Sequence, residues 1–439
     1  MFCRVLPHIA PLIYRYLDYL FPERHNNRWV LPDRLTTQKD RYPMTGMTAK
    51  QKLLFRWDGF RARLMTSPFY SLYRTARKSI HVWTHRGLWD SWICSGTEKC
   101  GGSPFKLVYA GSKQNKNYIL RTFFSEGASQ QPLGARSPDR LIRHALRSGC
   151  DVIFFEMNVN NAHLLKGRTH FKIPTWIELK LDMDSETTSP LKSGSLANIR
   201  RFWKQNELQY TVTQDEKELA EFYKTIYVSF SNHIHQGEGF VQPYQEVLRR
   251  FRSGELLLAS NENGWVGGVV LAYAPTEGQL LFGGMKNPSE KKEVMSSIFF
   301  QSFLRIKEKN LSVANWGYSH GFLRDGSFRY KARLGCRAAL PPQLTANDQC
   351  WTLRVLKQSP ALKSALMNHP FISLDETDAP WGIFFTDADP GSPGLVSSLT
   401  KDSLCKGLRG VRIYSWGQDG FDFNKSTSIL AEKESVKHL

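Results

Sequence analysis

Residues Gly254–Met285 read GELLLASNENGWVGGVVLAYAPTEGQLLFGGM and contain three apolar runs separated by two turn sequences. The runs ELLLAS, WVGGVVLAYA and GQLLFGG have the length and apolar content of buried strands. The turns are ENG at Glu262–Gly264 and PTEG at Pro275–Gly278. Short turns rich in Gly, Asn and Pro join antiparallel neighbours. This stretch therefore predicts a three-stranded antiparallel meander.

Helices are predicted on both sides of the meander. TVTQDEKELAEFYKTIYVSF has Thr213 three residues before Glu216, the spacing of a capping box, and its apolar residues fall on one helical face. QPYQEVLRRFRSG follows, with a proline at its start and a glycine at its end. After the meander, residues 293–309 form an amphipathic pattern, and LSVANWG then reads as a strand.

The first half of the chain has less regular patterns. FKLVYAGSKQNKNYILRTFFSE predicts two strands joined by a polar turn at Ser112–Asn117. SPDRLIRHALRSG predicts a helix with Ser137 as N-cap and Pro138 in the first helical position. The apolar run DVIFFEMN, Asp151–Asn158, predicts a buried strand. Strands and helices in this order indicate an α+β or α/β fold.

Composition shifts divide the chain. LDMDSETTSPLKSGS, Leu181–Ser195, is polar and rich in Ser, Thr, Pro and Gly, which is typical of a linker. We therefore predict a basic, aromatic extension over 1–47, a first domain over 48–184, a second over 195–350, and a C-terminal extension over 351–439. In that extension, WGIFF and GVRIYSW are predicted to be strands added to a sheet edge.

The totals restrict the partners and the compartment. The 439 residues carry a formal net charge of +19, which favours polyanions such as nucleic acid, anionic lipid or nucleotide-linked substrates. The seven cysteines include no CxxC pair, so we expect reduced thiols in a cytoplasmic protein. The N-terminal segment HIAPLIYRYLDYLF is interrupted by Arg15 and Asp18 and is too short to span a bilayer. It predicts a helix docked on the protein, or one lying on the inner membrane face.

Three segments carry a resemblance to a known family: NIRRFWKQNELQYTVTQDEKELAEFYKTIY, the meander, and ANWGYSHGFLRDGSFRYKARLG. Over residues 181–338 the chain resembles FemAB-like transferases of the GNAT acyltransferase fold, which include peptidoglycan-bridge aminoacyltransferases and acetyltransferases of polysaccharide biosynthesis. The resemblance implies two GNAT-like domains in tandem, each a mixed, largely antiparallel sheet flanked by helices.

Two departures from the family pattern concern the acyl donor. The glycine-rich Q/R-x-x-G-x-G/A turn of many acyl-CoA enzymes is replaced by MKNPSEKKEVMSSIFF, where Lys286, Lys291 and Lys292 could meet phosphates by charge. The long helical hairpin of some bridge-forming members is not apparent. The resemblance therefore implies acyl-CoA or aminoacyl-tRNA as donor, and the missing hairpin favours acyl-CoA.

The segment SFRYKARL holds the main catalytic candidate. It predicts a strand with Phe328, Tyr330 and Ala332 on one face and Arg329, Lys331 and Arg333 on the other. Lys331 matches the aromatic–lysine motif of FemAB-like enzymes, and the resemblance implies that it stabilises an oxyanion or holds a substrate phosphate. The alternative is an exposed strand lysine. Tyr330 is expected to pack or to bond the substrate.

Further candidates have a structural and a functional interpretation. The resemblance implies that Tyr318 protonates the leaving group, and the alternative is a buried structural tyrosine. Arg200 and Arg201 are expected to bind anionic substrate groups or to form a solvated helix face. Ser297 could bind a phosphate or cap a helix. Asp325 is expected to form a turn.

No metal site is predicted, because the pairs His163/His170 and His233/His235 have unfavourable spacing and no Cys or carboxylate companion. The function predicted is acyl transfer to an amine or hydroxyl of a cell-envelope or polysaccharide precursor. Its partners are that anionic substrate and, with an aminoacyl donor, tRNA. The alternative is a non-catalytic GNAT-fold protein that binds RNA or an anionic membrane surface.

Overall fold

The structure is a computed structural model. It describes residues 23–25, 28–30, 88–157, 165, 167, 169–183, 207–234, 241–287, 293–341, 350–389, 392, 394–400, 405–417, 420–422 and 426–430. The chain forms two compact units, residues 1–57 and residues 58–439. The described part of the first unit is a hairpin of β1 (Glu23–His25) and β2 (Arg28–Val30). The predicted N-terminal helix lies outside the described residues.

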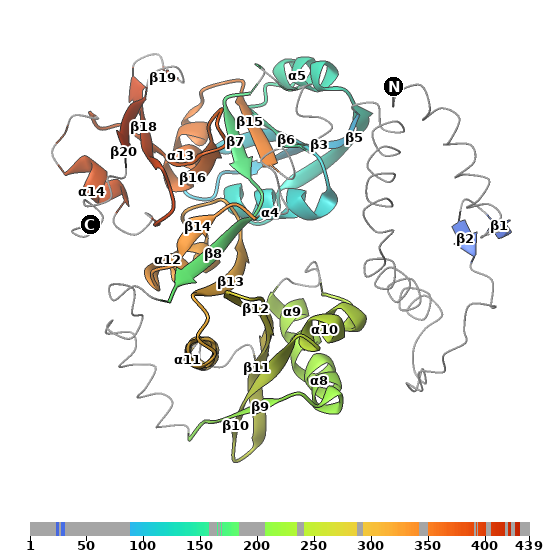
Figure 1. The fold of residues 1–439 in the computed structure, drawn as a ribbon. Coiled ribbons are helices and arrows are strands. Elements are labelled where there is room, and N and C mark those ends of the chain that lie inside the picture. Colours follow the sequence, from blue (N-terminus) through green and yellow to red (C-terminus); the bar gives the residue numbers. More distant parts are fainter. Residues whose placement is uncertain are drawn as a thin grey trace, which may run out of the picture. The chain divides into compact units, whose positions relative to one another are not determined.

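The predicted meander is confirmed and forms the centre of a seven-stranded mixed sheet (Figure 1). Its order is β14 (Arg337–Ala339), β8 (Ile177–Asp182), β13 (Val313–Ser319), β12 (Glu277–Met285), β11 (Gly264–Tyr273), β10 (Gly254–Asn261) and β9 (Gln209–Thr213). Strands β10, β11 and β12 pair antiparallel, whereas β12 and β13 pair parallel. A crossover helix is needed between parallel neighbours, and α11 (Glu293–Glu308) supplies it.

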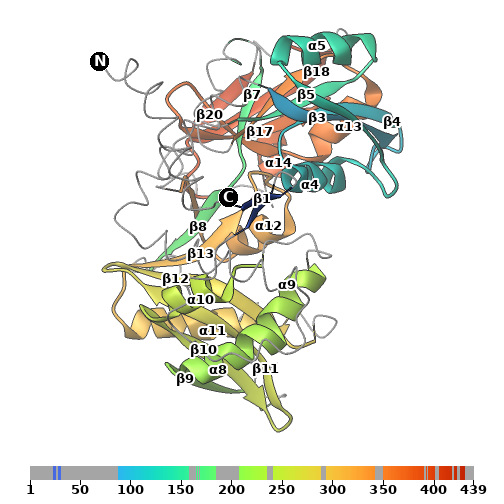
Figure 2. The same cartoon turned by 90° about the vertical axis from the view of Figure 1, so that its right-hand side faces the viewer.

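Helices cover both faces of this sheet. Helix α8 (Glu216–Phe222), the π-helical turn η5 (Tyr223–Tyr227), α9 (Val228–Ile234) and α10 (Tyr244–Phe251) lie on one face of β10–β12, and α11 lies on the other (Figures 1 and 2). The N-cap of α8 is Asp215, which accepts from the Lys217 N–H at 2.7 Å. The predicted cap at Thr213 is wrong by two residues, because Thr213 still belongs to β9.

The parallel strands β12 and β13 stay together only at their beginnings. Three residue pairs join them, from Glu277↔Val313 to Gln279↔Asn315. Beyond these pairs each strand has one extra residue relative to its other neighbour. In β12 it is Leu281, opposite β11; in β13 it lies between Asn315 and Tyr318, opposite β8. Such bulges bend a strand and raise its twist, so β12 and β13 diverge.

A six-stranded mixed sheet lies earlier in the chain. Its order is β5 (Ser129–Arg136), β3 (Trp89–Thr97), β4 (Pro104–Ala110), β6 (Val152–Met157), β15 (Cys350–Val355) and β7 (Phe171–Pro174). The predicted buried strand is β6, and the predicted helix is α5 (Pro138–Arg147) with Ser137 at its N-cap. Both predictions are confirmed.

The predicted turn and strand after β4 are wrong, because residues Lys113–Phe123 form helix α4. The Ser112 hydroxyl caps it by accepting from the Asn115 N–H at 3.3 Å. The apolar residues that suggested a strand, Ile119, Leu120 and Phe123, share the buried face of the helix.

The C-terminal region forms a further sheet. WGIFF lies in β17 (Pro380–Thr386) and GVRIYSW in β18 (Gly410–Gly417), and these two strands pair parallel. They join β16 (Phe371–Leu374), β19 (Gly420–Phe421) and β20 (Thr427–Leu430) in one five-stranded sheet, with α13 (Pro360–Asn368) and α14 (Leu395–Thr400) nearby in sequence. The two strands were correctly predicted. They build a sheet of their own and are not additions to another sheet's edge.

Two strands lie on one side of a predicted domain limit in sequence but pair in the sheet on the other side. β8 belongs to the segment before the predicted linker but pairs with β13 and β14 in the seven-stranded sheet. β15 follows the predicted second domain but pairs with β6 and β7. Residues 184–206, which include most of the predicted linker, lie outside the described residues, so the boundaries stay predictions.

The two mixed sheets flanked by helices confirm the expected α+β fold class. The seven-stranded sheet has the element order that the GNAT resemblance implies, with helices, a meander, a helix and a strand. Among the described residues, no helix is long and apolar enough to cross a membrane.

Candidate functional site

The segment SFRYKARL forms a helix, so the predicted strand is wrong. It lies in α12 (Gly326–Arg333), and Asp325 is the N-cap. The Asp325 carboxylate accepts from the Ser327 N–H at 2.9 Å and the Phe328 N–H at 3.1 Å. Asp is one of the preferred N-cap residues, and this cap outweighs the alternation of aromatic and cationic residues. Phe328 and Lys331, three residues apart, consequently share the buried face.

Lys331 is buried, with only 8% of its surface exposed. Its Nζ donates a hydrogen bond to the backbone carbonyl of Tyr318 at 2.9 Å. Burial lowers the pKa of Lys331 to about 8, although Cys336 and Asp325 act in the opposite direction. The ammonium has three N–H donors, and the Tyr318 carbonyl is its one hydrogen-bond acceptor among the described residues. The interpretation of Lys331 as an exposed strand lysine is therefore wrong.

The Tyr318 carbonyl places Lys331 at the divergence of the two parallel strands. Tyr318 lies on β13, three positions beyond Asn315, the last residue that pairs with β12. Its side chain is 50% exposed, so it is not a buried structural tyrosine. Burial of the hydroxyl and the negative charge of Glu178 raise its pKa, which keeps the hydroxyl protonated at neutral pH. Tyr318 thus has the protonation state of a proton donor.

A buried carboxylate faces Tyr318 from the neighbouring strand. Glu178 on β8 is the register partner of Tyr318, and only 5% of its surface is exposed. Its Oε2 forms an ion pair with Lys180 Nζ at 3.0 Å. The sequence analysis missed Glu178. The signal was present in IELKLD, where Glu178 and Lys180 alternate with buried apolar residues, a pattern that places both on one face of a strand.

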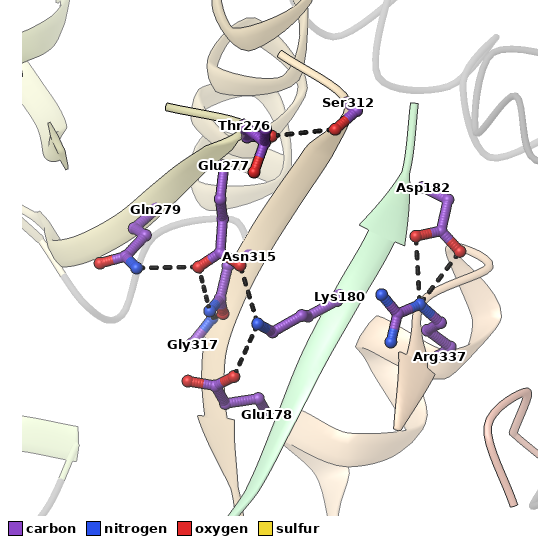
Figure 3. Close-up of polar contacts among 10 residues, drawn as sticks. All are labelled: Glu178, Lys180, Asp182, Thr276, Glu277, Gln279, Ser312, Asn315, Gly317 and Arg337. Atoms are coloured by element: carbon purple, nitrogen blue, oxygen red, sulfur yellow. Dashed lines mark hydrogen bonds and ion pairs between the residues drawn. The ribbon is translucent and has the colours of Figure 1, made fainter. Parts of the chain in front are cut away.

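Lys180 extends this polar face to the meander (Figure 3). Its Nζ also bonds Glu277 Oε2 at 2.7 Å. Glu277 Oε1 accepts from Asn315 Nδ2 at 2.9 Å and from Gln279 Nε2 at 2.8 Å. Burial opposes ionisation of Glu277, but these hydrogen bonds and the charge of Lys180 outweigh it and lower its pKa. The network therefore fixes β8, β13 and β12 where the parallel pair begins.

Tyr330 and Ser297 both hold α11 in place. The Tyr330 hydroxyl donates to Ser296 Oγ at 3.2 Å, and burial raises its pKa. Ser297 is buried; its hydroxyl donates to the Val294 carbonyl and accepts from the Tyr210 hydroxyl, both at 2.8 Å. The contact of Tyr330 is of the packing kind expected of it. Ser297 does not cap α11, because it lies inside the helix and its hydroxyl bonds a side chain and a carbonyl.

Three of the predicted binding residues, Arg200, Arg201 and Lys292, lie outside the described residues. Their contacts with anionic groups stay predictions. The structure brings together Lys331 and Tyr318 of the predicted set, and it adds Glu178. The contacts of Tyr330 are with α11.

His320 joins the two large sheets. Its ring lies between Tyr118 of α4, at 3.6 Å, and Trp176, at 4.1 Å between ring centroids. Its Nδ1 lies 2.8 Å from the Thr175 carbonyl, which can only accept, so this nitrogen carries the proton. Tyr118 also donates from its hydroxyl to Asp325 at 3.1 Å. Helix α4 of the six-stranded sheet thereby contacts the N-cap of the helix that carries Lys331.

The six described cysteines are free thiols. One group among the described residues offers three potential metal ligands close together, Glu98, Cys100 and His369. The sequence analysis did not predict it, because Cys100 and His369 are 269 residues apart.

Comparisons with known proteins find remote structural similarity. No family model matches the chain, and no curated protein matches it. L-PGS from Bacillus licheniformis is similar at 12% identity and a TM-score of 0.30, over 63% of this chain and 84% of that one. FemX is similar at 11% identity and a TM-score of 0.32, over 63% of this chain and 90% of FemX. A GCN5-related N-acetyltransferase from Kribbella flavida is similar at 10% identity and a TM-score of 0.27, over 78% and 77%. Similarity this remote assigns no activity to the chain.

Proposed function

We propose that the protein is an acyltransferase. It would move an acetyl or aminoacyl group from acyl-CoA or aminoacyl-tRNA to an amine or hydroxyl of a cell-envelope or polysaccharide precursor. The observation that carries the proposal is the buried ammonium of Lys331, which has one protein acceptor among the described residues and lies where β12 and β13 diverge. The envelope substrate rests on the sequence resemblance alone.

The proposed reaction is direct transfer. The lone pair of the acceptor nitrogen or oxygen attacks the acyl carbon, and the carbonyl oxygen becomes an oxyanion. Lys331 supplies N–H donors to that oxygen, an interaction that strengthens as the negative charge develops. Collapse of the intermediate breaks the C–S bond of a thioester or the C–O bond of an aminoacyl ester. No covalent enzyme intermediate is required.

Two protons must move in this reaction. The acceptor loses one, and Glu178 is a carboxylate in position to receive it, directly or through a water molecule. The leaving thiolate or alkoxide gains one, and the protonated hydroxyl of Tyr318, a residue that is half exposed, can donate it. Glu178 and Tyr318 are register partners on adjacent strands, so the same short region supplies both groups.

Ligand-induced thermal stabilisation tests the donor. The full chain is heated with acetyl-CoA, longer acyl-CoAs, aminoacyl-tRNA or uncharged tRNA, at low and high salt. A specific donor present at about 100 times its dissociation constant stabilises by about 3 kcal/mol. We expect one acyl donor to stabilise the protein at both salt concentrations. Equal stabilisation by every polyanion, lost at high salt, would support the non-catalytic binder instead.

Transfer of a radiolabelled acyl group tests the chemistry. We expect Lys331→Met to lower the transfer rate about 100-fold or more, as for loss of an oxyanion donor. Lys307→Met is the matched control, because Lys307 is an exposed lysine on α11. Equal rates in the two variants would contradict the role of Lys331.

A further inference from the structure

Three potential metal ligands meet at one end of the six-stranded sheet. Glu98 and Cys100 lie in the turn between β3 and β4, and His369 is the C-cap residue of α13. Cys100 Sγ lies 3.8 Å from His369 Nε2. One ligand atom of each residue lies within 4.8 Å of the other two. A thiol, an imidazole and a carboxylate therefore converge from segments 269 residues apart.

Glu98 is a buried carboxylate without a counter-ion among the described residues. None of its surface is exposed, and its oxygens accept from the backbone N–H groups of Cys100, at 3.1 Å, and Gly101. No ion pair within 4 Å joins Glu98 to a described Lys, Arg or His. Removing a carboxylate from water is costly unless a cation or several hydrogen bonds compensate. The carboxylate oxygens also keep lone pairs that the two N–H groups do not use.

Nearby cations do not take this role. The Lys99 ammonium donates to the Arg121 carbonyl at 3.1 Å. The Arg324 guanidinium donates to the carbonyls of Met367, at 3.4 Å, and Asn368, at 3.2 Å. Both side chains are exposed and are directed to backbone oxygens. Neither cation therefore forms an ion pair with Glu98.

The spacing matches tetrahedral zinc coordination. With Zn–S of about 2.3 Å, Zn–N of about 2.0 Å and a tetrahedral angle, the sulfur and nitrogen lie about 3.5 Å apart. The observed separation is 3.8 Å, so a small side-chain movement suffices. Burial lowers the pKa of His369 to about 4, and its imidazole is therefore neutral and able to bind a metal at neutral pH. Cys100 would bind as the thiolate, so metal binding would release the proton of the thiol.

We propose that Glu98, Cys100 and His369 bind a Zn²⁺ ion, with water in the fourth position. Sulfur, imidazole and carboxylate are the ligand types that zinc accepts together. Cys100 is exposed, which gives the ion a path from solvent. The ion would tie the β3–β4 turn to the end of α13 and so stabilise the fold. The inference is independent of the proposed acyl transfer.

Metal titration of the full chain tests the site. The protein is treated with a chelator, transferred to chelator-free buffer with a non-thiol reductant, and titrated with Zn²⁺ or Co²⁺. We expect one equivalent of each metal to bind. Co²⁺ should produce a thiolate-to-metal absorption band in the near ultraviolet, and Zn²⁺ should raise the unfolding temperature. Absence of saturable binding would overturn the proposal.

Variants locate the metal. Cys100→Ser and His369→Gln should each weaken Zn²⁺ binding by about 100-fold or more, since loss of a direct ligand exceeds the usual effect of losing an outer partner. Cys100→Ser should also remove the Co²⁺ absorption band. Cys150→Ala and His144→Gln serve as controls and should bind as the wild type does. Unchanged affinity in both ligand variants would place the metal elsewhere and overturn the proposal. Far-ultraviolet circular dichroism of the metal-free variants confirms that each is folded.

Discussion

The hydroxyl of Tyr118 donates a hydrogen bond to Asp325 at 3.1 Å, between residues 207 positions apart in the chain. Asp325 caps α12, and α12 carries Lys331. Burial and the charge of Asp325 raise the pKa of Tyr118 well above its usual value, so the hydroxyl stays a donor at any ordinary pH. A side chain of α4, the helix that follows β4 of the six-stranded sheet, thus helps to fix the helix that holds the candidate catalytic lysine.

Removing the Tyr118 hydroxyl should destabilise the fold moderately. We expect Tyr118→Phe to lower the free energy of unfolding by about 1 kcal/mol, the usual net value of such a hydrogen bond. Urea denaturation measures the change. In a protein that already carries Asp325→Ala, the same substitution should have almost no effect, because its acceptor is gone. Equal effects in both backgrounds would mean that Tyr118 acts through packing.

The buried ammonium of Lys331 should lower the free energy of unfolding at neutral pH, although the proposed activity needs it. Its pKa is about 8 in the folded protein, whereas a lysine in an unfolded chain has its ordinary pKa of 10.5. Between these values the unfolded state binds more protons, so this group makes stability rise as pH increases from about 8 to about 10.5. Below pH 8 the penalty is constant, at about 3 kcal/mol. Activity that needs the ammonium should fall as pH rises through about 8.

The Lys331→Met variant separates these effects. The methionine removes the charge penalty but leaves the Tyr318 carbonyl without its donor, which costs about 1–3 kcal/mol. We therefore expect a stability at pH 7 within about 1–2 kcal/mol of the wild type, with the pH-dependent rise above pH 8 reduced. Denaturation curves at pH 7 and pH 10 provide the comparison. A rise of unchanged size would mean that another group produces it.

The ion pairs of Lys180 in Figure 3 should contribute more to the free energy of unfolding than the more exposed pair of Arg337 and Asp182. Lys180 bonds two carboxylates, Glu178 and Glu277, and the three side chains are 14%, 7% and 17% exposed. Lys180→Met leaves both carboxylates without their cation and should cost about 3 kcal/mol. The control is Arg337→Met, whose pair with Asp182 is 37% and 49% exposed and should contribute at most about 1 kcal/mol. Equal losses of unfolding free energy would contradict the difference in burial.

Acidification should weaken the same network. The pKa of Glu277 is lower in the folded protein than its usual 4.5, because the bonds from Lys180, Asn315 and Gln279 outweigh the effect of burial. Its contribution to stability is therefore complete above about pH 4.5 and is lost as pH falls through the folded value. Glu277→Gln should make unfolding less sensitive to pH below about 4.5. An acid limb as steep as in the wild type would assign the dependence to other carboxylates.

Substitution of Gly317 tests whether the irregular part of β13 needs a glycine. Its φ is +73°, a conformation that costs a residue with a side chain about 1–2 kcal/mol. An added Cβ would lie 3.5 Å from the Leu280 carbonyl, which is an ordinary contact, so Gly317→Ala should pay only the backbone cost. Gly326→Ala is the control: it meets nothing within 4 Å and lies in the first turn of α12, where alanine should not destabilise. Thermal unfolding of the two variants gives the difference.

Much of the fold could be predicted from local patterns. The meander, α5, α11, β6 and β13 each have a complete signal within about 20 residues: a period, a turn or a cap. The errors are local ambiguities. Residues Lys113–Phe123 carry β-type side chains but follow a serine cap, and α12 alternates aromatic and cationic residues while also placing Phe328 and Lys331 on one helical face.

The site was only partly predictable. Lys331 and Tyr318 were identified through the family resemblance, whereas the burial of one and the exposure of the other were not. Glu178 was not predicted, because its register partner, Tyr318, lies 140 residues later in the chain. The Glu98, Cys100 and His369 group escaped for the same reason. Neither pairing has a local signal, since sequence spacing does not report which strands become neighbours.

Local sequence is thus sufficient for most secondary-structure elements and for the α+β class, because hydrogen bonding and side-chain periodicity act over a few residues. The candidate lysine came from the family resemblance. The tertiary structure was needed to show that β8 pairs in the seven-stranded sheet and β15 in the six-stranded sheet. It was also needed to show that Lys331 is buried and bonds the Tyr318 carbonyl, and that the Glu178 carboxylate is opposite Tyr318. These features depend on which distant surfaces become buried together. That choice is made by the sum of many packing contacts, each too small and too remote in sequence to be recognised alone.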